Sequence, residues 1–284
     1  MDGSMRWFRL RSRLKPLALA IGAAVAFLAT PQAQAHEGSF QAGGPGTPGT
    51  PSAPASSPIP PELKAKGKVY HALPGRERQV RFVSDAPFEK INGHSNGVTG
   101  FAVAGPADDP AKLQGGEWRL PVASLHTGNT TRDEHMRDAE WLDAAKFPEI
   151  TFRLKSVTDV RSLDEDKNPV IRAYAGTLVG DMTIHGVSKE MAIPATMRWR
   201  AASDATAKIA AGDFLVVSCS YSVRLSDFGV RHDVVTVKKK VAEVIQVETQ
   251  LLLTSVAPEE QPARPEPGKA RSEGEPPTPQ KKGG

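Results

Sequence analysis

The sequence predicts an all-β fold, an antiparallel barrel of about eight strands closed by one short helical lid. Three observations support this prediction. Long stretches alternate between apolar and polar residues with a period of two, which is typical of strands buried on one face. Short turns that contain Gly, Asn or Asp separate these stretches, as in an antiparallel meander. Only one stretch has a convincing helical pattern.

The alternating stretches place their apolar residues on one face of each predicted strand. One long stretch is 174–184, in which Tyr174, Leu178, Met182 and Ile184 share a face with two glycines. Such strands are polar on the opposite side, as the wall of a barrel requires. The predicted strands are 79–84, 150–155, 174–184, 191–197, 215–224 and 241–253.

The helical stretch covers residues 131–145. Thr131 and Glu134 have the spacing of a capping box, which predicts that the helix begins there. Asp138 is placed to cap a second short helix, and Pro148 ends the segment. A single helical insertion among strands predicts a lid over one end of the barrel.

Two other β architectures share part of this pattern. A sandwich of two sheets shows the same alternation and remains an open alternative. A membrane barrel needs an apolar band that faces the lipid. Charged residues, among them Arg81, Arg153, Lys155 and Glu243, occupy the predicted outer faces instead. A water-facing barrel of about eight strands has room for packed side chains or for one elongated ligand.

Residues 1–35 have the three parts of a secretory signal peptide. Five basic residues precede an apolar run from Leu17 to Ala29, and Ala33-Gln34-Ala35 provides the small residues of a cleavage site. The apolar run has 13 residues, and a helix that spans a bilayer needs about 20. An uncleaved anchor is therefore the weaker alternative. We expect a mature protein that begins at His36 and is periplasmic or secreted.

Proline marks the predicted domain boundaries. Seven of the 24 prolines fall in 36–66 and seven more in 257–284. Both stretches lack an apolar period, so they are predicted to be a disordered Pro/Gly-rich linker and a disordered Pro/Glu/Lys-rich tail. One folded domain, 67–256, lies between them.

Charge and cysteine content exclude some classes of protein. Without residues 1–35 the chain has 31 basic and 31 acidic residues. No net basic charge then attracts a polyanion, so a nucleic-acid partner is not expected. A single cysteine, Cys219, rules out intramolecular disulfides and a cysteine metal cage.

Three ordered motifs resemble the YceI family. The first, 123–136 continued by 141–152, has a Thr-Gly turn, then Arg-Asp-x-His-Met, and ends in Phe-Pro-x-Ile-x-Phe. The second, 180–189, reads Gly-Asp-Met-Thr-Ile-His-Gly-Val-Ser-Lys, and the third, 224–230, reads Arg-Leu-Ser-Asp-Phe-Gly-Val. This resemblance implies a lipocalin-like barrel, exported to the periplasm, that holds a polyisoprenoid in its lumen.

The inward face of the predicted strands supplies the candidate ligand-binding residues. They are Val80, Phe82, Phe152, Leu154, Tyr174, Leu178, Met182, Val217, Cys219, Tyr221, Ile245 and Val247. The alternative for each of them is a packed core residue. In a barrel filled in this way the module would be structural, and function would reside in the Pro-rich arms.

Arg132, Asp133 and His135 are the predicted anchors of the lid. A rival hypothesis is a metal-dependent periplasmic enzyme that uses His126, His135 and a nearby carboxylate. A catalytic zinc site requires three converging ligands, and no pair of histidines here has the His-x-x-x-His spacing. We therefore expect no metal and no cofactor.

The sequence thus predicts a binding protein rather than an enzyme. Its expected ligand is a polyisoprenoid or other long-chain lipid, which it would hold as a carrier or reservoir. Transient contact with a membrane surface and a homodimer are the further partnerships expected of it.

Overall fold

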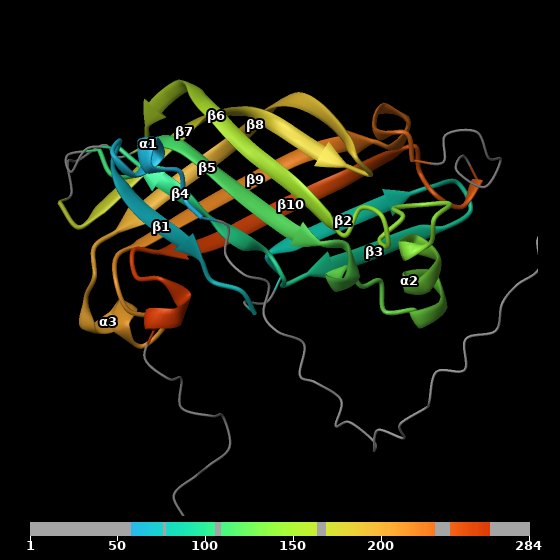
Figure 1. Cartoon of the computed structure of the whole chain (residues 1–284), viewed down its shortest axis with the longest axis horizontal. Coiled ribbons are helices and arrows are strands. Elements are labelled where there is room, and N and C mark those ends of the chain that lie inside the picture. The colour runs from blue at the N-terminus through green and yellow to red at the C-terminus, as the bar shows by residue number, and fades with distance from the viewer. Residues whose placement is uncertain (1–57, 76–77, 106–108, 164–168, 231–238, 262–284) are drawn as a thin grey trace, which may run out of the picture. The chain divides into compact units, whose positions relative to one another are not determined.

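The computed structural model describes residues 58–75, 78–105, 109–163, 169–230 and 239–261 (Figure 1). The predicted signal peptide, most of the predicted linker and the tail beyond residue 261 lie outside these ranges. Within them, no helix is long and apolar enough to cross a membrane.

Strands dominate the described chain, and every strand pair in it is antiparallel. The strands are β1 (Lys68–Ala72), β2 (Val80–Asp85), β3 (Lys90–Ser95), β4 (Thr99–Ala104), β5 (Leu113–Pro121), β6 (Glu149–Ser162), β7 (Ile171–Ile184), β8 (Val187–Arg200), β9 (Phe214–Arg224) and β10 (Val244–Thr254). The α-helices are α1 (Pro61–Lys64), α2 (Thr130–Arg137) and α3 (Asp204–Ala207). Short 3-10 helices are η1 (Val122–Ser124), η2 (Leu225–Phe228) and η3 (Pro258–Glu260).

The sheet closes on itself through β1 and β10. Its order is β1-β4-β5-β6-β7-β8-β9-β10-β2-β3, and an additional β1–β10 pairing joins the two ends. Both β1 and β2 pair with β10, at 253–254 and 246–249 respectively, so they form one wall strand interrupted by a loop. The pairs β1–β4 and β2–β3 likewise make β3 and β4 one interrupted strand. The wall therefore has eight strand positions, which confirms the predicted antiparallel barrel over the sandwich.

The helical lid differs from the prediction in its boundaries. Asn129, not Thr131, caps α2, because its side chain accepts a hydrogen bond from the Arg132 backbone N–H at 3.1 Å. The second helix predicted after Asp138 is wrong. The Asp138 carbonyl instead accepts hydrogen bonds from the N–H groups of Trp141 and Asp143, and Asp143 has a positive φ of 45°. These tight turns replace the helix.

Ordered contacts continue outside the range 67–256 at both ends. Helix α1 lies in the stretch predicted as linker, and its Leu63 side chain covers Gly115 of β5 so closely that a Cβ there would lie 2.8 Å from Cδ2. At the other end, the Gln261 amide accepts a hydrogen bond from the Ala211 backbone N–H at 2.8 Å and donates one to the Val256 carbonyl at 3.1 Å. Both contacts tie the flanks to the barrel.

One end of the barrel is solid. Tyr70, Met197, Leu215 and Leu253 are completely buried there, where β1 meets the ends of β8 and β10 and the start of β9. Trp199 Nε1 donates a hydrogen bond to the Tyr70 hydroxyl at 2.8 Å, which satisfies two polar groups in an otherwise apolar region. This packing forms a floor for the other half of the barrel.

Candidate functional site

The other half of the barrel is hollow. A cavity of about 720 Å³ lies between the floor and α2, which is within the usual range for ligand pockets, about 300–1,000 Å³. Inward residues of β2, β3 and β5 to β10 form its wall, and α2 with the turn after it forms part of its rim. The alternation along each strand explains the apolar wall, because every second side chain points inward.

Ten of the twelve candidate ligand-binding residues line this cavity. They are Val80, Phe82, Phe152, Leu178, Met182, Val217, Cys219, Tyr221, Ile245 and Val247. Leu154 and Tyr174 are buried but do not line it. Tyr174 pairs with Met197 in the solid end, and its hydroxyl donates a hydrogen bond to Asp109. Leu154 is the last residue of β6 that pairs with β5, and the register of the β6–β7 pair shifts directly after it, between Leu154 and Ser156. That a ligand contacts the ten remains a prediction.

Several lining residues were not among the candidates. Trp118 on β5 stacks on Phe152, with ring centroids 6.1 Å apart and an interplanar angle of 20°. Ile193 and Leu251 lie on the inward faces of predicted strands, but the prediction did not include them among the residues that reach the cavity. Met136, Trp141 and Leu142 come from α2 and the turn after it. The apolar side of that segment was visible in the sequence, although its contact with the lumen was not.

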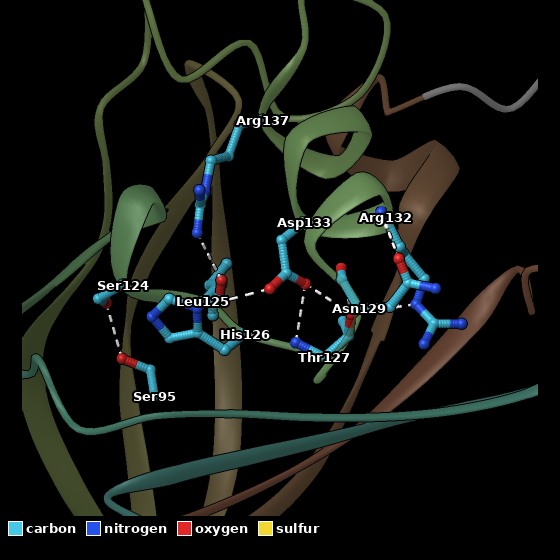
Figure 2. A network of polar contacts seen from close by, with 9 residues as sticks. All are labelled: Ser95, Ser124, Leu125, His126, Thr127, Asn129, Arg132, Asp133 and Arg137. Atoms are coloured by element: carbon cyan, nitrogen blue, oxygen red, sulfur yellow. Dashed lines mark hydrogen bonds and ion pairs between the residues drawn. The ribbon is translucent and has the colours of Figure 1, made fainter.

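Arg132 joins the lid to the rim of the barrel. Its guanidinium binds the carboxylate of Glu89, which lies just before β3, at 2.6 Å. Figure 2 shows its other contact, in which Nε donates to the Thr127 hydroxyl at 3.0 Å. Arg137 at the end of α2 donates to the Leu125 carbonyl at 3.1 Å. These contacts fix both ends of the helix to the segment that precedes it.

Asp133 is the most buried residue of α2. Its carboxylate accepts hydrogen bonds from the backbone N–H and the hydroxyl of Thr127, and His126 Nδ1 lies 3.5 Å from it (Figure 2). Burial alone would raise the pKa of Asp133, but the bonds from Thr127 and His126 outweigh it and hold that pKa below its usual value. The carboxylate therefore stays ionised and holds the lid closed on the 125–129 loop.

The two histidines of the rival metal hypothesis do not converge on one site. His126 is hydrogen-bonded to Asp133, and its ring centroid lies 6.3 Å from that of His94. His135 is exposed on α2 and borders the cavity at its rim. Arg132 and Asp133, by contrast, are bonded to the residues around the lid. In the described part of the chain no three His, Cys, Asp or Glu side chains are grouped so as to hold a metal ion.

A group of three polar side chains interrupts the apolar wall on β9 and β10. Cys219 lies opposite Thr249 across the β9–β10 pair, and Tyr221 lies two residues along β9, opposite Val247. Burial raises the pKa of the Cys219 thiol to about 11, partly offset by a hydrogen bond with Thr249. Burial also raises the pKa of Tyr221. Both groups are therefore neutral at physiological pH.

The chain is similar in sequence to several known proteins. A UPF0312 protein of Enterobacter sp. strain 638 is 30% identical over 125 residues, which are 44% of this chain and 56% of that protein. Protein YceI of Escherichia coli O6:H1 is 27% identical over 154 residues, 54% of this chain and 69% of that protein. The chain thus spans little more than half of the Enterobacter relative.

Among solved structures, a polyisoprenoid-binding domain from Saccharophagus degradans superposes with a TM-score of 0.46 and 13% identity, over 66% of this chain and 99% of that one. The sequence profile of the YceI-like domain matches residues 72–253. This match begins at the last residue of β1 and ends within β10, so it covers the closed wall of the barrel. The chain therefore belongs to the YceI-like family.

Proposed function

We propose that the protein binds one long apolar molecule, such as a polyisoprenoid, in its barrel and acts as a carrier or reservoir for it. The observation that supports this proposal is the apolar cavity with a solid floor and a rim that carries charged side chains. An elongated lipid would place its chain against the wall and any charged group at the rim. Binding rather than catalysis is the activity that such a site favours.

Energetics favour transport over tight storage. Burying one C5 unit out of water contributes about 3 to 4 kcal/mol at roughly 0.8 kcal/mol per CH₂. The natural competitor for a membrane lipid is the bilayer, which solvates the same chain equally well. The net gain on entering the cavity is therefore small, and release back to a membrane costs little.

Ligand binding is tested by native mass spectrometry of protein purified from its host's cell envelope, with organic extraction of the bound lipid. We expect a co-purifying long-chain lipid in stoichiometric amount. Titration with the neutral fluorophore N-phenyl-1-naphthylamine provides a second measurement. Absence of any extractable lipid, together with no saturable fluorescence increase, would exclude the proposal.

We propose further that the rim meets a membrane surface. Phe88, 76% exposed, lies in the turn between β2 and β3, and its N–H donates to the carbonyl of exposed Lys239 at 3.0 Å. Lys240 is also exposed and borders the cavity. An exposed ring beside cations is suited to the interface of an anionic bilayer. In vesicle flotation, Phe88→Ser should lower the bound fraction, whereas Ile209→Ser, which follows α3 at the solid end, should not.

Export through residues 1–35 belongs to the same proposal, because a lipid carrier of the envelope has to leave the cytoplasm. Residues 1–35 lie outside the described structure. N-terminal sequencing of the exported protein should return His36. A sequence beginning at Met1 would mean that the leader is retained as an anchor.

A further inference from the structure

Two polar groups on the wall of the cavity have no hydrogen-bond partner in the described chain, Trp118 Nε1 and the Tyr221 hydroxyl. The Tyr221 side chain lines the cavity, and within the described chain its hydroxyl makes no hydrogen bond. A hydroxyl that faces an apolar cavity loses part of its hydration, which costs free energy unless another group binds it. Tyr221 therefore differs from Tyr70 and Tyr174, whose hydroxyls are bonded to Trp199 and Asp109.

The position of Tyr221 is deep rather than at the mouth. Moving along β9 toward the solid end, the inward residues are Val223, Tyr221, Cys219, Val217 and then the fully buried Leu215. Tyr221 and the Cys219–Thr249 pair thus lie between the rim and the floor. They form a polar patch, defined as Cys219, Tyr221 and Thr249, on an otherwise apolar wall.

The chemistry of the patch fits an uncharged oxygen. A tyrosine hydroxyl can donate to a carbonyl or a hydroxyl, and the thiol and the threonine hydroxyl beside it add weaker polar contacts. The charged lining residues come from the rim, except Arg119, whose guanidinium binds Glu117 and Glu149. A phosphate carried inward would lose its hydration without compensation.

We propose that the polar patch is a subsite for a neutral oxygen at the inner end of the ligand. The cavity would then prefer an amphiphile with a carbonyl or hydroxyl group to a pure hydrocarbon of equal length. This inference rests on the proposed function, since it concerns the same ligand. It adds that the molecule enters with its uncharged oxygen end first and leaves any charged group at the rim.

The test compares 2-dodecanone with dodecane as competitors for N-phenyl-1-naphthylamine, in the wild type and in Tyr221→Phe. For each protein, the ratio of the two half-displacement concentrations measures its preference for the carbonyl. A net hydrogen bond of about 1 kcal/mol corresponds to roughly a fivefold change in affinity. We therefore expect Tyr221→Phe to weaken the preference for the ketone about fivefold while dodecane binds as before.

Val247→Ala is the matched control, because Val247 lies directly across from Tyr221 and contributes only apolar contact. It should weaken both competitors alike and leave the ratio unchanged. If both compounds displace the fluorophore but Tyr221→Phe keeps the wild-type ratio, the subsite is wrong while lipid binding stands. If neither compound displaces it from any variant, the proposed function fails and this inference fails with it.

Discussion

Exchanging leucine for tryptophan at two positions separates the hollow half of the barrel from the solid half. Leu178 lines the cavity, 2% exposed, and Leu215 is fully buried in the solid end, on β7 and β9 respectively. Both substitutions add the same volume to an inward position. In a closely packed region the added ring forces neighbouring side chains out of their rotamers, whereas beside a cavity it enters free space.

The expected difference is large enough to measure. Overpacking a solid core costs about 1–3 kcal/mol. For a domain of roughly 200 residues each kcal/mol lowers Tm by about 2–4 °C, so Leu215→Trp should lower Tm by about 2–12 °C. Leu178→Trp should change Tm by less than about 2 °C, because its indole is small beside a cavity of about 720 Å³.

The assay combines thermal unfolding followed by circular dichroism with titration of N-phenyl-1-naphthylamine. Leu178→Trp should lower the fluorophore affinity several-fold, since the ring takes up space in the cavity, and Leu215→Trp should leave the affinity of the folded protein intact. A Leu178→Trp protein that is as destabilised as Leu215→Trp, with unaltered fluorophore binding, would refute the division into two halves. A one-residue shift in register would also be revealed, because Leu178 would then point outward and neither property would change.

Three further results are expected. The bonds from Thr127 lower the pKa of Asp133 in the folded protein, so its ionised carboxylate stabilises the fold at pH values above the unfolded pKa of about 3.9. This contribution to the free energy of unfolding is lost as the pH falls through the lower pKa of the folded state. Asp133→Asn should therefore flatten the dependence of Tm on pH below about pH 5. Cys219, with a pKa of about 11, should react with N-ethylmaleimide at pH 8 about a hundredfold more slowly than a free thiol of pKa about 8.5, as measured by mass spectrometry. Gln261→Ala should destabilise the protein by about 1 kcal/mol in urea unfolding, through the lost hydrogen bonds to Ala211.

The alternation of apolar and polar residues was sufficient to predict the long strands. Strands β6 to β9 each contain a predicted segment, and β10 overlaps the predicted 241–253, which begins three residues before that strand. By contrast, β3 and β5 were missed because glycine occupies inward positions at which the period-two pattern needs an apolar residue. A Cβ on Gly93 would lie 2.0 Å from Phe82 Cζ. The Phe82 ring, from the neighbouring strand β2, therefore fills the volume that a side chain at position 93 would occupy. A sequence read strand by strand cannot show such an exchange.

The site was predictable to the same extent and for the same reason. Inward residues of the long strands were found, since face follows from register. Depth along the barrel was not, and this is why Tyr174 was taken for a lumen residue although it packs against the floor. The lid was placed in the right segment, but whether Thr131 or Asn129 starts the helix depends on which side chain reaches a free N–H.

The size of the cavity bears on how a carrier of this kind works. When nothing occupies the cavity of about 720 Å³, its apolar wall lacks the packing contacts that a filled core provides. Water is a poor filler, because a wall of Leu, Ile and Val offers it few hydrogen bonds. A bound lipid therefore stabilises the hollow half, while the solid floor keeps the barrel folded during exchange. Release of a bound lipid would then be favoured where another apolar phase receives it directly, as at the membrane surface that we propose the rim meets.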